Sequence, residues 1–147
     1  MIFNPGIVPQ AGGGGGAVEY IAGPLVTTAA NAAMEFDLSQ VDMTKVAALF
    51  VVFSIRASSG TASVLANDSV VSTICSNNNS TSAGIVWLMP LNGTIGAFST
   101  CAVTKSNYAS GNGGTNTTVE WTAVNKVTIE GSSYTGATAT LFAVKKP

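Results

Sequence analysis

Three acidic residues lie close together in the sequence, and their carboxylates are groups that could bind a divalent cation: Glu35, Asp37 and Asp42. A calcium-binding loop places acidic residues at alternate positions ahead of a glycine, and this segment lacks that pattern. Glu35 and Asp37 instead alternate with the apolar residues Met34 and Phe36, as on the solvent-facing side of a strand. The sequence therefore predicts a polar strand face here, with no metal site and no cofactor.

Glu120 and Glu130 are a second acidic pair, and two carboxyl groups are what a glycosidase uses. If both lie on one straight strand, they are about 33 Å apart, which is too far for both to reach one glycosidic bond. The chain contains no histidine, and its many Ser and Thr residues include no Ser-x-x-Lys arrangement that would activate a hydroxyl. We therefore expect a protein that is not an enzyme.

Charged side chains are scarce, with six basic and seven acidic residues among 147 and a net charge of −1. So small a net charge gives no electrostatic attraction to nucleic acid or to an anionic membrane. The longest charge-free apolar run, Val46–Ile55, is far shorter than the stretch of about 20 residues that a membrane-spanning helix needs. An apolar content of 46% is sufficient for a single core. The expected partners are proteins, with no nucleic acid and no membrane.

Residues 1–16 differ from the rest of the chain. Pro5 and Pro9 exclude a helix, and the five glycines Gly12–Gly16 act as a flexible tether that lacks the Gly-Lys-Ser/Thr ending of a phosphate-binding loop. This segment is either a frayed terminus or an arm that docks on a neighbouring molecule. We expect a docking arm, whose contact residues are Ile2, Phe3, Pro5, Ile7, Val8 and Pro9. The predicted organisation is an arm and tether over 1–16 and a body over 17–147.

From residue 17 onward, apolar and polar residues alternate as they do in strands with one buried face. The clearest case is Val119–Glu130, which is either one long strand or two short strands bent at Asn125. Its polar face includes Val124, and its apolar face carries Val119, Trp121, Ala123, Val127 and Ile129. Further strands are expected at 17–21, 25–28, 34–38, 62–66, 70–75, 85–89, 94–103 and 137–145. Turn residues separate them, among them Asn67-Asp68, Asn92-Gly93 and Gly111–Gly114. This spacing predicts an all-β fold, an antiparallel β-sandwich that is jelly-roll-like, with an extended N-terminal arm.

The segment Val46–Ile55 departs from the alternation because it is apolar on both faces. An antiparallel sandwich usually leaves one face of each sheet in water, so such a strand needs a second cover. A loop, the N-terminal arm or another subunit could supply it, and a cover from the same chain is the simplest. Because few charges remain to solvate the surface, a free monomer would tend to associate. We therefore expect an assembled protein.

Four aromatic residues are the remaining candidates for recognition. Trp87 lies in the apolar run Ile85–Met89 and Trp121 lies on an apolar strand face, so both are expected in the core. Tyr108 and Tyr134 lie in loops rich in Ser and Gly. An exposed tyrosine could stack on a sugar ring and form hydrogen bonds with its hydroxyls. These two tyrosines are the candidate glycan contacts.

Cys75 and Cys101 are the two cysteines of the chain. The sequence from Met1 to Pro5 lacks the basic start and the long apolar stretch of a signal peptide, so we expect synthesis without export, in a reducing cytoplasm. Two buried, reduced thiols are expected there, with a disulfide as the alternative. Neither cysteine has a histidine or a second Cys-x-x-Cys pair nearby, so no zinc site is predicted.

The proline-containing arm, the polyglycine tether and the segment VTIEGSSYTGATATLFAV of residues 127–144 resemble small virion proteins of tailed bacteriophages, among them tail appendage and head-decoration proteins. The resemblance implies a non-enzymatic β-sandwich subunit that assembles in the host cytoplasm, with copies of itself and other virion proteins, and is located in the virion. We therefore expect a structural protein that decorates or extends a virion and is anchored through its arm. The alternative is a carbohydrate-binding or receptor-binding module that contacts a host surface glycan through Tyr108 and Tyr134.

Overall fold

The computed structural model describes residues 17–27, 32–57, 62–74, 80–103, 109–131 and 134–147. The strands are β1 (Val18–Thr27), β2 (Met34–Asp37), β3 (Val46–Ala57), β4 (Ala62–Ala66), β5 (Ser69–Ile74), β6 (Ser80–Leu91), β7 (Thr94–Val103), β8 (Ala109–Glu120), β9 (Lys126–Gly131) and β10 (Tyr134–Lys145). Two short 3-10 helices, η1 (Met43–Lys45) and η2 (Trp121–Ala123), interrupt them. No helix in these ranges is long and apolar enough to cross a membrane. The predicted all-β class is confirmed.

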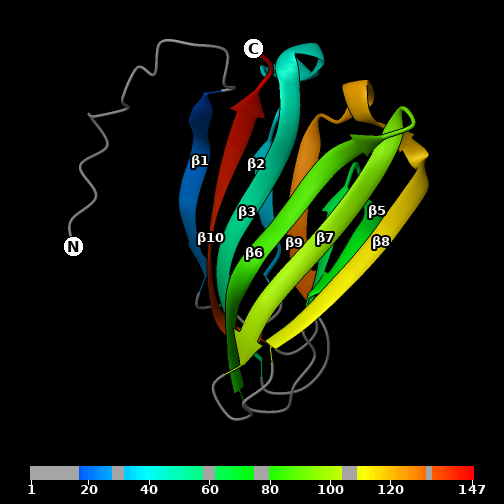
Figure 1. Ribbon diagram of the computed structural model, residues 1–147. Coiled ribbons are helices and arrows are strands. Elements are labelled where there is room, and N and C mark those ends of the chain that lie inside the picture. Colours follow the sequence, from blue (N-terminus) through cyan, green and yellow to red (C-terminus); the bar gives the residue numbers. More distant parts are fainter. Residues whose placement is uncertain (1–16, 28–31, 58–61, 75–79, 104–108, 132–133) are drawn as a thin grey trace.

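The strands form two sheets that pack face to face (Figure 1). The large sheet has six strands in the order β1-β10-β3-β6-β7-β8, and the small sheet has four in the order β2-β9-β4-β5. All of the paired strands are antiparallel. In Figure 1 the large sheet lies in front and the small sheet behind it. The predicted antiparallel β-sandwich is therefore confirmed.

The strand order is that of a jelly roll with an added hairpin. β1 pairs with β10, β2 with β9, β3 with β6 and β4 with β5. The chain thus doubles back on itself as a ribbon of nested pairs, and this ribbon wraps around the core. β7 and β8 follow β6 and extend the large sheet beyond the ribbon.

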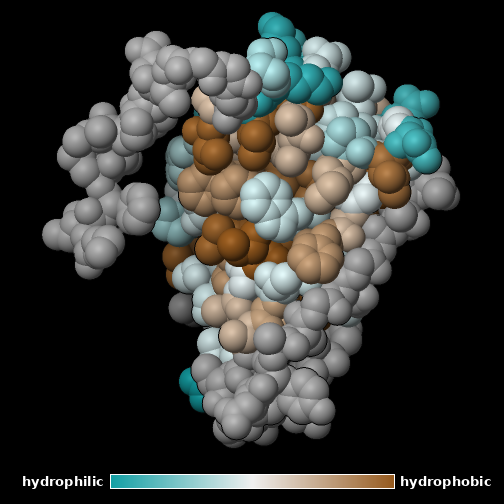
Figure 2. Space-filling view, in the orientation of Figure 1, coloured by the Kyte–Doolittle hydropathy of each residue, from teal (hydrophilic) through white to brown (hydrophobic). Residues whose placement is uncertain are grey.

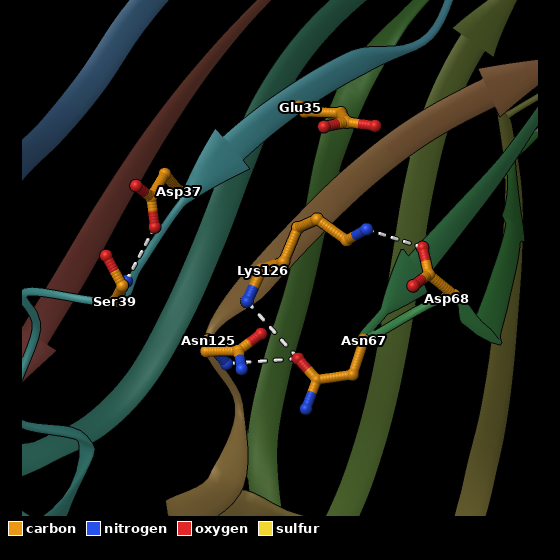
Figure 3. Close-up of a pocket in the computed structure, with 7 residues that line it drawn as sticks. All are labelled: Glu35, Asp37, Ser39, Asn67, Asp68, Asn125 and Lys126. Atoms are coloured by element: carbon orange, nitrogen blue, oxygen red, sulfur yellow. Dashed lines mark hydrogen bonds and ion pairs between the residues drawn. The ribbon is translucent and has the colours of Figure 1, made fainter.

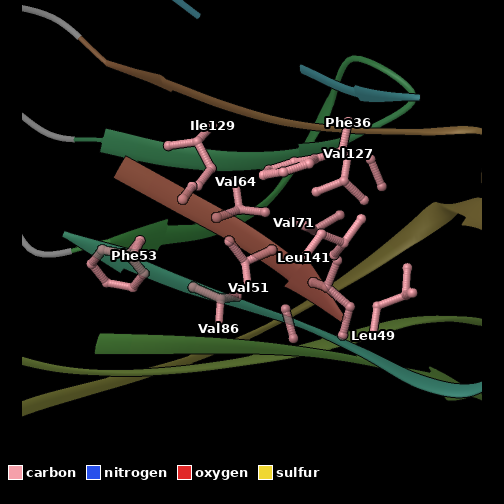
Figure 4. Packing of buried hydrophobic residues seen from close by; sticks show 14 of the residues in the cluster. Phe36, Leu49, Val51, Phe53, Val64, Val71, Val86, Val127, Ile129 and Leu141 are labelled. Carbon is pink, nitrogen blue, oxygen red and sulfur yellow. The ribbon is translucent and has the colours of Figure 1, made fainter. Parts of the chain in front are cut away.

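The core lies between the sheets and uses alternate residues of each strand (Figure 4). Phe36, Val64 and Ile129 of the small sheet point toward the large sheet, and Val51 and Leu141 of the large sheet point back toward them. Each of these side chains is at most 1% exposed. Full burial of a side chain of this size contributes about 1.5–3 kcal/mol. The core therefore holds the two sheets together.

Two predicted turns are confirmed, and each closes a hairpin with a two-residue loop. Asn67 and Asp68 join β4 to β5 with φ angles of 47° and 65°, and Asn92 and Gly93 join β6 to β7 with φ angles of 51° and 83°. Positive φ at both central positions is the geometry of a type I′ turn, whose twist matches the flanking strands. Asn, Asp and Gly adopt it at the lowest cost, which is why these turns could be predicted.

A third predicted turn is wrong, because Gly111–Gly114 lies inside β8. Gly111 pairs with Thr100 and Gly113 pairs with Phe98 across the β7–β8 hairpin. Glycine weakens a strand through its conformational freedom. Pairing along most of the length of β7 outweighs that local preference.

Of the two alternatives for Val119–Glu130, the single long strand is wrong, because η2 interrupts it and carries the chain from β8 in the large sheet to β9 in the small sheet. Two strands are present, but they are separated by η2 and the residues after it instead of by a bend at Asn125 alone. The turn shifts the phase of the alternation, so Ala123 is exposed and Val124 is only 3% exposed. Trp121 is buried as predicted, and its Nε1 donates a hydrogen bond to the Val46 carbonyl at 3.2 Å.

The two segments predicted at 17–21 and 25–28 are one strand, β1. Its register against β10 shifts twice around Gly23, which has a φ of 120°. This irregularity breaks the alternation of apolar and polar residues, and the break led to the prediction of two strands. The structure has one edge strand with a bulge instead.

Cys101 of β7 is buried and disulfide-bonded. The expected reduced thiol is therefore wrong at this position, and the alternative is correct. The other cysteine of the sequence, Cys75, lies outside the described residues. The expectation rested on an inferred compartment, and a compartment does not determine which sulfur atoms a fold brings together.

Candidate functional site

The small sheet carries the polar residues that the sequence pointed to. β2 alternates as predicted, with Met34 and Phe36 buried and Glu35 and Asp37 exposed. The two carboxylates line a pocket of about 620 Å³ at one end of the sheet (Figure 3). The other lining residues follow β2, form the β4–β5 turn or begin β9: Ser39, Asn67, Asp68, Asn125 and Lys126.

Asn67 connects the parts of this pocket. Its Oδ1 accepts hydrogen bonds from the backbone N–H groups of Asn125 (3.0 Å) and Lys126 (3.2 Å), and its Nδ2 donates to the Ala123 carbonyl (2.8 Å). The backbone N–H of Leu38 donates to the Asn125 carbonyl at 2.7 Å. The link between η2 and β9 is therefore fixed to the β4–β5 turn on one side and to the end of β2 on the other.

Three of the four charged groups of the pocket, Asp37, Asp68 and Lys126, have a bonded partner within it. Lys126 Nζ lies 2.6 Å from Asp68 Oδ1, and this hydrogen bond raises the pKa of Lys126, with the charges of Asp68 and Glu35 acting in the same direction. The backbone N–H of Ser39 donates to Asp37 Oδ1 at 2.8 Å, and this bond, together with the Ser39 hydroxyl, lowers the pKa of Asp37. A lysine that stays protonated and a carboxylate that stays ionised are poor proton-transfer groups at neutral pH. The pocket is therefore a cluster of polar contacts that links β2, the β4–β5 turn and the start of β9.

Asp42 does not join Glu35 and Asp37. It caps η1, where its Oδ1 accepts from the Thr44 hydroxyl (2.5 Å) and backbone N–H (3.1 Å), and its Oδ2 lies 3.2 Å from Lys45 Nζ. These contacts, with the Thr44 hydroxyl contributing most, lower the pKa of Asp42. Among the residues that the structure describes, no group of three His, Cys, Asp or Glu side chains is arranged to hold a metal ion.

We expect Asn67→Ala to lower the free energy of unfolding by about 2–3 kcal/mol. Three side-chain hydrogen bonds are lost, each contributing about 0.5–1.5 kcal/mol, and alanine is strained at the φ of 47°. Asn67→Gly loses the same hydrogen bonds without the strain, so its effect should be about 1 kcal/mol smaller. Urea unfolding followed by circular dichroism measures both variants. Losses below about 0.5 kcal/mol in both variants would show that the hydrogen bonds of Asn67 do not stabilise the fold.

The large sheet carries a different kind of surface, a row of aromatic residues on its outer face. We call it the aromatic ladder, and its members, in the order of β1, β10, β3, β6 and β7, are the cross-strand partners Tyr20, Phe142, Phe50, Trp87 and Phe98. The ring centroids are 6.0 Å apart for Tyr20 and Phe142, 4.9 Å for Phe142 and Phe50, and 4.6 Å for Phe50 and Trp87. Aromatic pairs at such distances contribute about 0.5–1.5 kcal/mol each. The ladder therefore ties neighbouring strands together.

The three middle rings of the ladder pack against one another along the row. The planes of Phe142 and Phe50 differ by 11° and those of Phe50 and Trp87 by 35°. Phe142, Phe50 and Trp87 therefore each have a neighbouring ring packed against them, whereas Tyr20 meets Phe142 at 77°. A sugar ring needs an open aromatic face for stacking. Only the two ends of the row, Tyr20 and Phe98, are as much as 56% and 46% exposed.

The surface beside the ladder is largely apolar, and the nearest charged side chain on the same face of β3, Arg56, lies four residues beyond Val52. Together with the ladder, it makes up what we call the ladder face, whose other members are Val18, Val52, Ile85, Met89, Thr100, Thr140 and Val144. Val18, Val52 and Met89 are 50%, 41% and 41% exposed. Figure 2 shows hydrophobic residues gathered over the large sheet, with hydrophilic residues at its upper end. The cover that the doubly apolar segment Val46–Ile55 was expected to receive from the same chain is not provided by the described residues.

Trp87 is a correction to the sequence interpretation, because it lies half-buried on the ladder face instead of in the core. Its neighbours Val86 and Leu88 take the core positions of β6 and are 0% exposed. The run Ile85–Met89 is apolar on both faces, as Val46–Ile55 is, and the two runs pair as neighbours in the sheet. Two doubly apolar strands were the available signal for this surface, but the sequence did not show that they pair.

The other predicted site residues are not brought together. Glu120 ends β8 in the large sheet, whereas Glu130 lies in β9 of the small sheet. Tyr134 begins β10, where it pairs with Ala57, and its side chain lies outside the described part of the structure. Tyr108 is also outside it, as are the arm residues Ile2, Phe3, Pro5, Ile7, Val8 and Pro9.

No protein-family model matches this chain, and no curated protein matches its sequence. The surfaces of the molecule itself are therefore the guide to its function. Of the two surfaces described, the pocket has most of its charged groups paired within it, whereas the ladder face is open.

Proposed function

We propose that this chain is a structural subunit without enzymatic activity that decorates or extends a bacteriophage particle. The observation that carries the proposal is the ladder face, an uncharged aromatic surface that the described residues leave open. Soluble monomers rarely expose contiguous apolar patches larger than a few hundred Å². Aromatic residues and methionine, with few charges, are typical of the centre of a protein interface. Such a surface supports a role in an assembly.

The pocket supports the same proposal. Its lysine is held by Asp68 and its Asp37 carboxylate by the Ser39 backbone, so these groups stabilise the fold. The resemblance to virion proteins of tailed bacteriophages supports the kind of assembly. In this proposal the body forms the repeated unit. Residues 1–16, which carry no charged side chain, anchor it to neighbouring virion proteins.

We expect the chain to be present in phage particles purified from the cells that encode it, and deletion of residues 2–16 should remove it from them. The body should remain folded, because its core lies within residues 34–143. Mass spectrometry of gradient-purified particles measures incorporation, and circular dichroism of the purified variant measures folding. A matched variant changes Ile2, Phe3, Ile7 and Val8 to Ser, which keeps the length of the arm and removes its apolar side chains. It should also fail to incorporate.

The results separate the candidate functions. Unchanged incorporation of the shortened chain would contradict anchoring by the arm. If the full-length chain is absent from particles but binds a glycan array, and Tyr108→Ala or Tyr134→Ala abolishes that binding, the carbohydrate-binding alternative replaces the proposal.

A further inference from the structure

We propose that the ladder faces of different copies of this chain pack against one another, so that the subunit associates with itself through its large sheet. This inference rests on the proposed assembly function and names the partner at the exposed surface. The partner is a second copy, and its own ladder face is the contacting surface.

The distribution of charge favours a second copy. Copies related by symmetry bring the same patch of each subunit together, so a charge near the centre would face a like charge of its partner. The ladder face has no charged member. The acidic side chains Glu35, Asp37 and Asp68 gather at the pocket on the other sheet. The surface that is free of charge is therefore the one on which identical copies can meet without repulsion.

The size of the ladder face sets how much of the contact it can supply. Five strands spaced about 4.8 Å apart cover about 24 Å, and its three rows of side chains at about 6.8 Å per two residues cover about 20 Å. The face therefore measures about 490 Å², or about 980 Å² when two copies contribute. Stable interfaces bury about 1,200–2,000 Å² in total. The ladder face therefore supplies most of a small interface, and residues beside it must contribute the rest.

The orientation of the rings favours a protein surface over a sugar. Phe50 packs against both Phe142 and Trp87, with centroids 4.9 Å and 4.6 Å apart, so neighbouring rings cover part of the faces on which a sugar would stack. The rings and the exposed side chains beside them, Val52 and Met89, form an uneven apolar surface. Such a surface can interdigitate with a second one, as in the core of a protein interface.

The test is the oligomeric state of the purified full-length chain, measured by sedimentation velocity between about 1 and 100 μM. Wild type should form a defined oligomer. Val52→Lys and Phe98→Lys, which change side chains 41% and 46% exposed, should weaken association at least about 100-fold because each buries an unpaired charge. Val70→Lys is the matched control: Val70 is 52% exposed on β5 of the small sheet, and this variant should keep the oligomer.

Tryptophan fluorescence gives a second measurement. Trp121 is already buried, whereas Trp87 is half-buried on the ladder face. Assembly should therefore protect Trp87 from acrylamide as the protein concentration rises, and Val52→Lys should abolish that protection.

Three results would overturn the inference. The first is a wild type that stays monomeric at the highest concentration. The second is association unchanged by both ladder-face variants. The third is an oligomer that is lost on deletion of residues 2–16 but persists in Val52→Lys, which would make the arm the contact. A monomer that still enters phage particles refutes this inference alone, and an oligomer absent from particles refutes the proposed function alone.

Discussion

Gly84→Ala is expected to lower the free energy of unfolding by about 3 kcal/mol or more. Gly84 lies in β6 opposite Cys101 of β7. A Cβ atom at this position would lie 2.0 Å from the carbonyl oxygen of Thr100 and 2.8 Å from the Cα of Cys101. Both contacts are with the backbone of a paired strand, so the clash cannot be relieved by rotating a side chain. β6 and β7 would have to separate in the middle of the large sheet.

Gly136→Ala is the matched control for Gly84→Ala. Gly136 also lies in a strand of the large sheet, β10, but the nearest atom to its added Cβ, the Thr27 carbonyl oxygen, is at an ordinary contact distance of 3.8 Å. Where alanine fits, it stabilises by about 0.4–1 kcal/mol by restricting the unfolded chain. The two variants should therefore shift the urea midpoint in opposite directions. Equal shifts would show that the close approach at Gly84 is not what requires glycine.

Trp121→Ala is expected to lower the free energy of unfolding by about 3–5 kcal/mol. The side chain is 3% exposed, and its Nε1 donates to the Val46 carbonyl at 3.2 Å. Its backbone N–H donates to the Gly93 carbonyl at 2.9 Å. Removing the indole leaves a cavity where the chain crosses between the sheets, and it leaves the Val46 carbonyl without this donor. If the alanine variant does not fold, Trp121→Phe should still lose about 1–3 kcal/mol from the missing hydrogen bond.

Trp87→Ala is the control, because it removes the same side chain from a less buried position. Trp87 is half-buried on the ladder face, where its ring lies against Phe50. Under conditions where the protein is monomeric, its loss should stay below about 2 kcal/mol. Urea unfolding at low protein concentration measures both variants. Comparable losses would contradict the assignment of Trp121 to the core and of Trp87 to the surface.

The fold was largely predictable because most strands and turns are indicated by the residues within them. Met34–Asp37 alternates, and Asn67-Asp68 and Asn92-Gly93 are residue pairs that accept positive φ. Where prediction was wrong, pairing across the sheet outweighed local preference. The glycines of β8 are held in a strand by β7, and the turn at η2 reversed the exposure expected for Ala123 and Val124.

The candidate sites were predictable only in part. Glu35 and Asp37 were identified as an exposed pair, but Asn67 was recognised only as a turn residue, since its three side-chain hydrogen bonds reach a segment more than fifty positions away. The ladder depends on register. Phe142 and Phe50 are far apart in the chain and become neighbours only through the β10–β3 pairing.

β10 also determines when this molecule can fold during synthesis. It follows every other strand in the chain, yet it lies between β1 and β3 and pairs with both. Until the ribosome releases it, β1 and β3 each have an open edge, and the nested ribbon cannot close. Contacts such as Val18 with Val144 join segments from opposite ends of the ribbon, and closures of this length are slow. The molecule therefore completes its large sheet, and with Phe142 the middle of the aromatic ladder, only after β10 has been synthesised, so a chain without β10 cannot form the proposed contact between ladder faces.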